Sequence, residues 1–269
     1  VAEPVLEIDN LSVRFNLKRG VLRAVDGVSF SIGKGETFGL VGESGSGKTV
    51  TARSIMRLVQ SPPGEIASGT VCFEGRDIYQ MSDAEIREIR GQHIAMIFQE
   101  PMTALNPVFT VGSQIGDALR TNMGLNKAEA RERTIEMLQL VGIPSPAARI
   151  DNYVHELSGG MRQRVMLAMA LSCDPTFLIA DEPTGNVDDR IAERLMRLFE
   201  ELNRLGTTII LATHNDSLRA SFPHPSLILK HGQLKYSGEG YVEDRSHMTM
   251  AWDQVEQTVL SAMELGRKA

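Results

Sequence analysis

The sequence predicts an α/β protein built around a mainly parallel sheet. The first observation is a set of short, nearly continuous apolar runs, ETFGLVG, TFLIAD and TTIILAT. Runs of this kind are typical of strands that are covered on both faces. The second is that stretches with helical periodicity separate these runs along the chain. Such alternation favours strands that are connected by helices and therefore run parallel.

The N-terminal part predicts an antiparallel β region before that core. Residues 5–15 (VLEIDNLSVRF) and 21–32 (VLRAVDGVSFSI) alternate between apolar and polar side chains and are separated by glycine, as in the two strands of a hairpin. The apolar run 36–42 then leads into a glycine-rich loop, and we expect a helix over 48–59. The order strand, loop, helix is the start of an α/β unit.

The middle of the chain predicts an inserted helical subdomain over about residues 99–170. A short apolar strand at 93–98 (HIAMIF) precedes it, and the segment 99–157 contains no further apolar strand. Two prolines interrupt the stretch that follows the strand. After the paired glycines 159 and 160, we expect a buried helix over 159–173.

One helix of this subdomain has its boundaries written in the sequence. Residues 126–141 begin with Asn126, which can cap a helix, and Glu129 stands three residues later. This is the capping-box spacing, in which each side chain binds the other residue's backbone N–H. Gly142 follows directly and can end the helix.

The last third predicts another helix and a separate tail. Apolar residues spaced 4, 3, 4 and 3 apart form one stripe that Gly206 ends: Ile191, Leu195, Leu198, Leu202 and Leu205. We expect one nucleotide-binding domain over residues 1–240 and a tail over 241–269. The tail predicts one amphipathic helix with Trp252, Val255, Val259 and Met263 on a face.

Composition limits the classes of function. The chain has 269 residues, 42% of them apolar, and a net charge of −6, so we expect a globular core and no nucleic-acid partner. Cys72 and Cys173 are the only cysteines, and we expect two unpaired thiols in a reducing compartment. No apolar run approaches the roughly 20 residues that span a bilayer. The start VAEPVLEIDN does not resemble a signal peptide, and we expect a cytosolic location.

The segment GESGSGKT matches the phosphate-binding loop G-x-x-x-x-G-K-[ST], and it lies between a strand and a helix as that loop requires. Its glycines allow backbone N–H groups to point at phosphate oxygens, and the lysine adds a positive charge. The threonine hydroxyl can bind Mg²⁺, and the helix dipole favours an anion there. The sequence therefore predicts a P-loop NTPase that binds a nucleotide through Gly42, Glu43, Ser44, Gly45, Ser46, Gly47, Lys48 and Thr49.

A second acidic element predicts the hydrolytic part of the site. Asp181 ends the apolar run FLIAD and Glu182 follows it, at the edge where open α/β sheets collect ligands. We expect Asp181 to hold Mg²⁺, directly or through water. Glu182 is placed to polarise the water that attacks the γ-phosphate.

Two further polar residues follow apolar strands. Gln99 comes after the strand at 93–98 and His214 after TTIILAT, so both are expected at the same sheet edge. Gln99 can touch the metal or the attacking water, and His214 can donate a hydrogen bond to the γ-phosphate. Phe15 could stack on an adenine ring, and ordinary sheet packing is the alternative.

The segment LSGGMRQR forms a second glycine-rich helix start. Ser158, Gly159 and Gly160 precede a helix, and such a start also binds anions. A nucleotide needs one phosphate loop, so the second one implies either a second nucleotide or a second subunit. Because the chain has a single Gly-x4-Gly-Lys-Thr motif, a second subunit is the simpler explanation.

These motifs, in this order over residues 5–238, resemble the nucleotide-binding subunits of ABC transporters. The resemblance implies two ATP sites between two head-to-tail subunits, identical or different. It implies that Ser158 and Gly160 grip the γ-phosphate of ATP bound to the partner's Lys48. Asp188 matches the family's loop that links the two sites. It also implies ATP and Mg²⁺ as ligands and a place on the cytoplasmic face of the inner membrane, beside separate transmembrane permease subunits.

The subfamily resemblance changes along the chain. Up to about residue 182, segments such as QEPMTALNP are similar to the ATPases of oligopeptide, dipeptide and nickel importers. From DEPTGNVD onward the sequence is similar to cell-division and lipoprotein-export ATPases. A natural mosaic, a divergent member and an engineered chimera would all produce this pattern.

Two functions follow from the resemblance. The first is an ATPase subunit that powers import of peptides or similar small solutes. A solute-binding protein would be an indirect partner of this subunit. The second is an ABC-type ATPase that regulates a cell-envelope process, such as division, through a membrane partner. DNA-repair ATPases share the glycine loop, but the long coiled coils or zinc modules expected of that class are missing from this sequence.

Overall fold

The computed structural model describes residues 4–185, 187, 189–215 and 224–235. The described chain forms two compact units. The first contains residues 4–90, 178–182 and the described part of 202–235, and the second contains the described part of residues 91–201 apart from 178–182. The tail helix predicted within 241–269 lies outside the described residues.

An antiparallel sheet opens the first unit, as the sequence predicts. Its strands are β1 (Pro4–Leu17), β2 (Gly20–Gly33), β4 (Gly64–Phe73) and β5 (Arg76–Asp77), in the order β2-β1-β4-β5. β1 pairs antiparallel with both β2 and β4. The sequence analysis did not identify β4, because its two glycines and a serine weaken the strand signal; pairing with β1 supplies what local propensity lacks.

The predicted parallel sheet is also present. In the first unit β3 (Thr37–Val41) pairs parallel with β8 (Thr208–Thr213) and with β9 (Ser226–Lys230). The strand order is β10-β9-β3-β8-β7, with β7 at Phe177–Asp181 and the short β10 at Gln233–Lys235. All residues of β7 and β8 are buried, which explains their continuous apolar sequences.

The first helix is shorter than the sequence predicted. α1 covers Lys48–Ile55 and does not continue to residue 59. Arg57 takes a positive φ of 48°, and the guanidinium of Arg90 donates to the carbonyl oxygens of Met56 and Arg57 at 2.8 and 2.7 Å. These contacts satisfy carbonyl groups that a longer helix would use, so the helix ends there.

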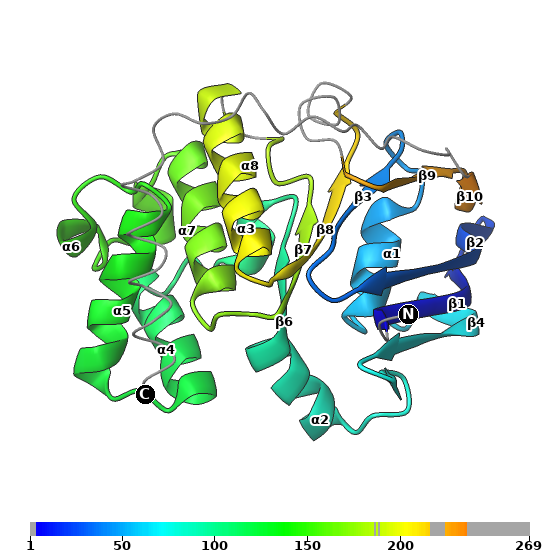
Figure 1. The fold of residues 1–269 in the computed structure, drawn as a ribbon, viewed down its shortest axis with the longest axis horizontal. Coiled ribbons are helices and arrows are strands. Elements are labelled where there is room, and N and C mark those ends of the chain that lie inside the picture. The colour runs from blue at the N-terminus through cyan, green and yellow to red at the C-terminus, as the bar shows by residue number, and fades with distance from the viewer. Residues whose placement is uncertain (1–3, 186, 188, 216–223, 236–269) are drawn as a thin grey trace. The chain divides into compact units, whose positions relative to one another are not determined.

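Helices dominate the second unit. They are α3 (Pro101–Ala104), α4 (Val111–Met123), α5 (Lys127–Leu140), α6 (Pro146–Arg149), α7 (Gly159–Leu171) and most of α8 (Asp189–Arg204), together with the strand β6 (Ile94–Ile97). In Figure 1 the green helices α4, α5 and α7 lie side by side, and all three pairs are in contact. The helix α2 (Asp83–Glu88), like α1, belongs to the first unit.

Two boundary predictions are confirmed in these helices. Asn126 caps α5 by accepting hydrogen bonds from the N–H groups of Ala128 and Glu129, while the Glu129 carboxylate accepts from the Asn126 N–H. α8 stops at Arg204, and Gly206 takes a φ of 106° that favours glycine. Cys72 and Cys173 are both free thiols, as expected.

Candidate active site

The phosphate-binding loop lies between β3 and α1, as the sequence predicted. The Lys48 ammonium donates to the carbonyl oxygens of Gly42 at 2.6 Å and Glu43 at 3.0 Å. The lysine therefore folds back over its own loop while remaining buried. Its charge is held where the loop's backbone curls, next to the N-terminus of α1.

Two glycines of this loop are required by the surrounding chain. Gly47 has a φ of 106°, and a Cβ there would lie 2.5 Å from the carbonyl oxygen of Ala24. A Cβ on Gly42 would lie 2.4 Å from the Leu229 carbonyl oxygen. Both distances are shorter than real Cβ contacts, so the loop's path depends on the absence of side chains at these positions.

Glu182 lies at the centre of a charge network. Its Oε1 atom is 3.5 Å from the Lys48 ammonium and 2.8 Å from Nδ1 of His214. Lys48 and Glu182 are buried, with side chains 6% and 7% exposed, while the His214 side chain is 60% exposed. The structure thus brings the predicted lysine and the predicted histidine each to within contact distance of the predicted acid.

The end of β8 holds Glu182 in place. Glu182 has a φ of 49°, unusual for a residue other than glycine, and its N–H donates to the Ala212 carbonyl oxygen at 2.8 Å. The Thr213 hydroxyl lies 3.5 Å from Oε2 of Glu182 and accepts from the Asn215 N–H at 3.1 Å. Thr213 is a neighbour of the site that the sequence analysis missed; its position just before His214 was the available signal.

Asp181 and Thr49 form the neighbouring part of the edge. The Thr49 hydroxyl donates to Oδ1 of Asp181 at 3.1 Å. Asp181 is 1% exposed, and this burial raises the pKa of its carboxyl group, partly offset by the Thr49 hydrogen bond. A carboxylate that is held in a buried place beside a hydroxyl is a natural place for a cation, because a cation would relieve the cost of burying the charge.

One buried polar atom of the loop is suited to contact an anion. Ser46 is 5% exposed, and its hydroxyl oxygen has no hydrogen-bond partner among the described residues. Buried polar groups are rarely left unpaired. An anion in the loop would supply the acceptor that this hydroxyl lacks.

The second glycine-rich loop belongs to the second unit and has a different environment. Ser158 caps α7 by accepting from the Met161 N–H at 3.4 Å, and both Ser158 and Gly159 are exposed. A Cβ on Gly159 or Gly160 would meet nothing within 4 Å. The chain's own packing therefore does not require glycine at these two positions.

The remaining predicted residues have separate outcomes. Gln99 is exposed and belongs to the second unit, so its role at the nucleotide edge stays a prediction. Phe15 is half-buried in β1, paired with Leu22 of β2 and Gly64 of β4, and its adenine contact also stays a prediction. Asp188 lies outside the described residues.

The strand, phosphate loop and helix, with the acid and histidine at the sheet edge, define a protein of the P-loop nucleotide-hydrolysing class. Comparison with known families makes this specific, because the model of the family described as "ABC transporter" matches residues 25–185. The chain belongs to this family and is an ATPase of the ABC type.

Curated relatives support the assignment. The dipeptide transport ATP-binding protein DppD of Bacillus subtilis is 46% identical over 237 residues, which are 88% of this chain and 71% of DppD. The oligopeptide transport ATP-binding protein OppD of the same organism is 43% identical, over 87% of this chain and 66% of its own length. DppD of Escherichia coli is 44% identical, over 88% and 72%.

Solved structures share the fold. A dimeric post-hydrolysis state of the ATP-binding cassette MJ0796, bound to ADP and Pi, superposes with a TM-score of 0.78 at 26% identity, covering 86% of this chain and 97% of that one. CbiO1 from Clostridium perfringens, part of the transporter complex cbiONQ, has a TM-score of 0.70 at 26% identity, covering 99% and 94%. No helix in the described part of the chain is long and apolar enough to cross a membrane.

Proposed function

We propose that this ATPase powers the import of peptides, or of small solutes bound in a similar way, through separate transmembrane subunits. The observation that carries the proposal is the 43–46% identity to ATPases named for dipeptide and oligopeptide transport. It is supported by the site, in which a buried acid contacts both the loop lysine and a histidine. We further propose that residues 1–240 form the nucleotide-binding domain.

In the proposed reaction the loop binds the phosphates of ATP and Glu182 acts as general base. Its carboxylate takes a proton from the attacking water while the Lys48 ammonium stabilises negative charge on the phosphates. Nδ1 of His214 lies 2.8 Å from Oε1 of Glu182. From there His214 is placed to orient the attacking water and to donate a hydrogen bond to the γ-phosphate. Gln99 completes the water contact, and Phe15 stacks on the adenine ring.

We propose a Mg²⁺ site at Thr49 and Asp181, with Gln99 as a further ligand. The hydroxyl and the carboxylate are hard oxygen donors that already lie 3.1 Å apart. The described residues contain no cluster of three or more His, Cys, Asp or Glu that could hold a metal. This donor set fits Mg²⁺, which binds through one or two protein oxygens and the phosphates of a nucleotide, and when bound it would neutralise phosphate charge.

The second loop is proposed to act on the nucleotide of a partner subunit. Ser158, Gly159 and Gly160 offer an exposed helix N-terminus with open space at both glycines, which favours close approach of a phosphate. The partner is a second ATPase subunit, a copy of this chain or a related one. Asp188 would connect the two sites.

Exposed apolar side chains of the second unit support the proposed membrane partners. Met102, Val108, Phe109 and Tyr153 are large side chains that are 42–70% exposed. Phe109 and Tyr153 come from segments that meet at the backbone bridge between Thr110 and Tyr153. We propose that the permease docks on this part of the helical subdomain 99–170, which holds the chain at the cytoplasmic face of the membrane.

Reconstitution of the complex tests the function. The chain is isolated from membranes together with its bound subunits, placed in lipid nanodiscs, and assayed for ATP hydrolysis with and without a solute-binding protein loaded with dipeptides or oligopeptides. We expect two permease subunits and a peptide-dependent rise in hydrolysis that Glu182→Gln abolishes. A single membrane protein as partner, with hydrolysis indifferent to any peptide, would overturn import and favour envelope regulation.

A further inference from the structure

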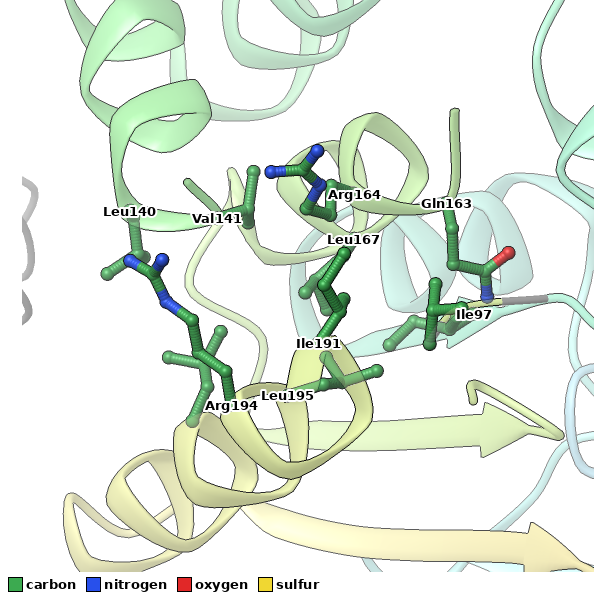
Figure 2. Close-up of a pocket in the computed structure, with 11 residues that line it drawn as sticks. Ile97, Leu140, Val141, Gln163, Arg164, Leu167, Ile191, Arg194 and Leu195 are labelled. Atoms are coloured by element: carbon green, nitrogen blue, oxygen red, sulfur yellow. The ribbon is translucent and has the colours of Figure 1, made fainter. Parts of the chain in front are cut away.

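The second unit contains an apolar pocket that the nucleotide site does not use. Its cavity volume is about 60 Å³, and it is partly open to solvent. Leu140 and Val141 at the end of α5, Leu167 of α7 and a row of α8 side chains line it. Figure 2 shows Ile191 and Leu195 of α8 beside Leu167, and the Arg194 guanidinium on the side of Leu140.

The α8 wall of this pocket has two parallel rows. Ile191, Leu195 and Leu198 line it at helical spacing. Arg190 and Arg194 form a second row, four residues apart on the same helix side, and both are exposed. Neither arginine has an ion pair or hydrogen bond with the described residues. Like charges at this spacing disfavour a helix. The helix therefore carries two neighbouring cations with no anionic partner among the described residues.

The predicted tail helix has the complementary pattern. Its apolar stripe is Trp252, Val255, Val259 and Met263, and acids stand one residue after three of these positions, at Asp253, Glu256 and Glu264. In a helix, residues one position further along form a neighbouring row. The tail therefore pairs an apolar row with an acidic row, as the α8 wall pairs an apolar row with a basic one.

We propose that residues 249–265 of the same chain dock on this pocket as an amphipathic helix. Trp252 enters the pocket, since a large aromatic side chain in an apolar recess is the usual anchor of such contacts. Asp253 and Glu256 face Arg190 and Arg194. The linker between Lys235, the last described residue, and Thr249 has 13 residues and could extend about 45 Å.

The pocket's position gives the contact a consequence for the ATPase. Gln163 also lines the pocket, and its amide group donates to the Pro183 carbonyl oxygen at 3.0 Å. Pro183 directly follows Glu182 in the chain. A docked tail would stabilise the hydrogen bond between Gln163 and Pro183. We therefore expect removal of the tail to lower the melting temperature of the chain.

The single tryptophan makes the test direct, because Trp252 is the only one in the chain. In the full chain we expect blue-shifted emission and protection from acrylamide quenching, both independent of protein concentration. Arg190→Glu combined with Arg194→Glu should expose Trp252, and so should Asp253→Arg combined with Glu256→Arg. Joining all four changes should restore protection. Circular dichroism checks that each variant is folded.

Matched controls separate docking from general charge effects. Lys127→Glu reverses an exposed cation elsewhere in the second unit, and Gln254→Arg adds a cation to the opposite side of the tail helix; both should leave Trp252 protected. A tryptophan that is fully accessible in the unaltered chain overturns the proposal. Protection that appears only at high concentration, or that survives both charge reversals, also overturns it, the former indicating docking on a second copy.

Discussion

The two glycine-rich loops of this chain differ in what their glycines do. In the phosphate loop, a side chain at Gly42 or Gly47 would collide with backbone carbonyl groups of the same unit. At the second loop, a Cβ on Gly159 or Gly160 would enter open space. Both glycines of the second loop lie in α7 without positive φ angles, so its fold would accept alanine.

The difference indicates where each loop's constraint comes from. Glycine in a helix interior is unfavourable by about 0.5–1 kcal/mol relative to alanine, and α7 begins with two of them. The first loop needs glycine to build itself. The second loop has glycines that its own structure does not require. This is expected if a group outside the chain must approach the backbone of this loop closely.

The largest expected effect tests the acid beside the first loop. Glu182→Gln should slow ATP hydrolysis by about 10²- to 10⁴-fold, the usual contribution of a general base, because an amide cannot accept the proton. ATP binding, measured by equilibrium titration, should remain. Glu7→Gln is the control, since Glu7 is an exposed acid of β1 in the same unit and outside the loop, and it should leave turnover unchanged. Unaltered hydrolysis in Glu182→Gln would contradict the assignment.

A mixing experiment tests whether the second loop works in trans. Lys48→Ala should weaken nucleotide binding, and Ser158→Arg should block closure, so each variant alone should be inactive. In a mixed dimer with head-to-tail sites, one site would combine both intact residues. A random equal mixture should therefore recover about a quarter of the wild-type activity, because half of the dimers are mixed and each has one intact site. A mixture as inactive as its components would place both loops at the same subunit's nucleotide.

Stability measurements sharpen the comparison of the glycines themselves. Gly47→Ala should destabilise the chain by about 1–3 kcal/mol, because φ is 106° and the Ala24 carbonyl oxygen is in the way. Gly160→Ala should be neutral or stabilising by up to about 1 kcal/mol, following helix propensity, yet should reduce hydrolysis. Urea unfolding without nucleotide measures the first quantity. Comparable destabilisation by both substitutions would remove the distinction between the loops.

Sequence predicted the buried strands and the site more completely than the edges of the fold. FLIAD and TTIILAT are apolar throughout because they are covered, and the polar residues that follow them are then placed by the strands. The strand β4 was not predicted, because its pairing with β1, a distant part of the chain, stabilises it. The end of α1 at Ile55 was not predicted, because it depends on Arg90, 35 residues later, which donates to the carbonyl groups just beyond the helix. Such tertiary contacts leave no local pattern.

The smallest expected effect concerns Asp181 and follows from the sign of its pKa shift. Its pKa is raised above the unfolded value of 3.8, chiefly by burial. Between these two values the folded chain binds more protons than the unfolded one, so stability falls as the pH rises through this window and stays lower above it.

Asp181→Asn keeps an oxygen for the Thr49 hydrogen bond and removes the buried charge. Without nucleotide or Mg²⁺, its melting temperature at pH 7 should therefore rise by a few degrees, given about 2–4 °C per kcal/mol for a chain of this size. Asp9→Asn, at an exposed position of β1, should leave the melting curve unchanged. If Asp181→Asn melts lower than the unaltered chain at every pH, the carboxylate stabilises the fold, and this would contradict a cation site at Thr49 and Asp181.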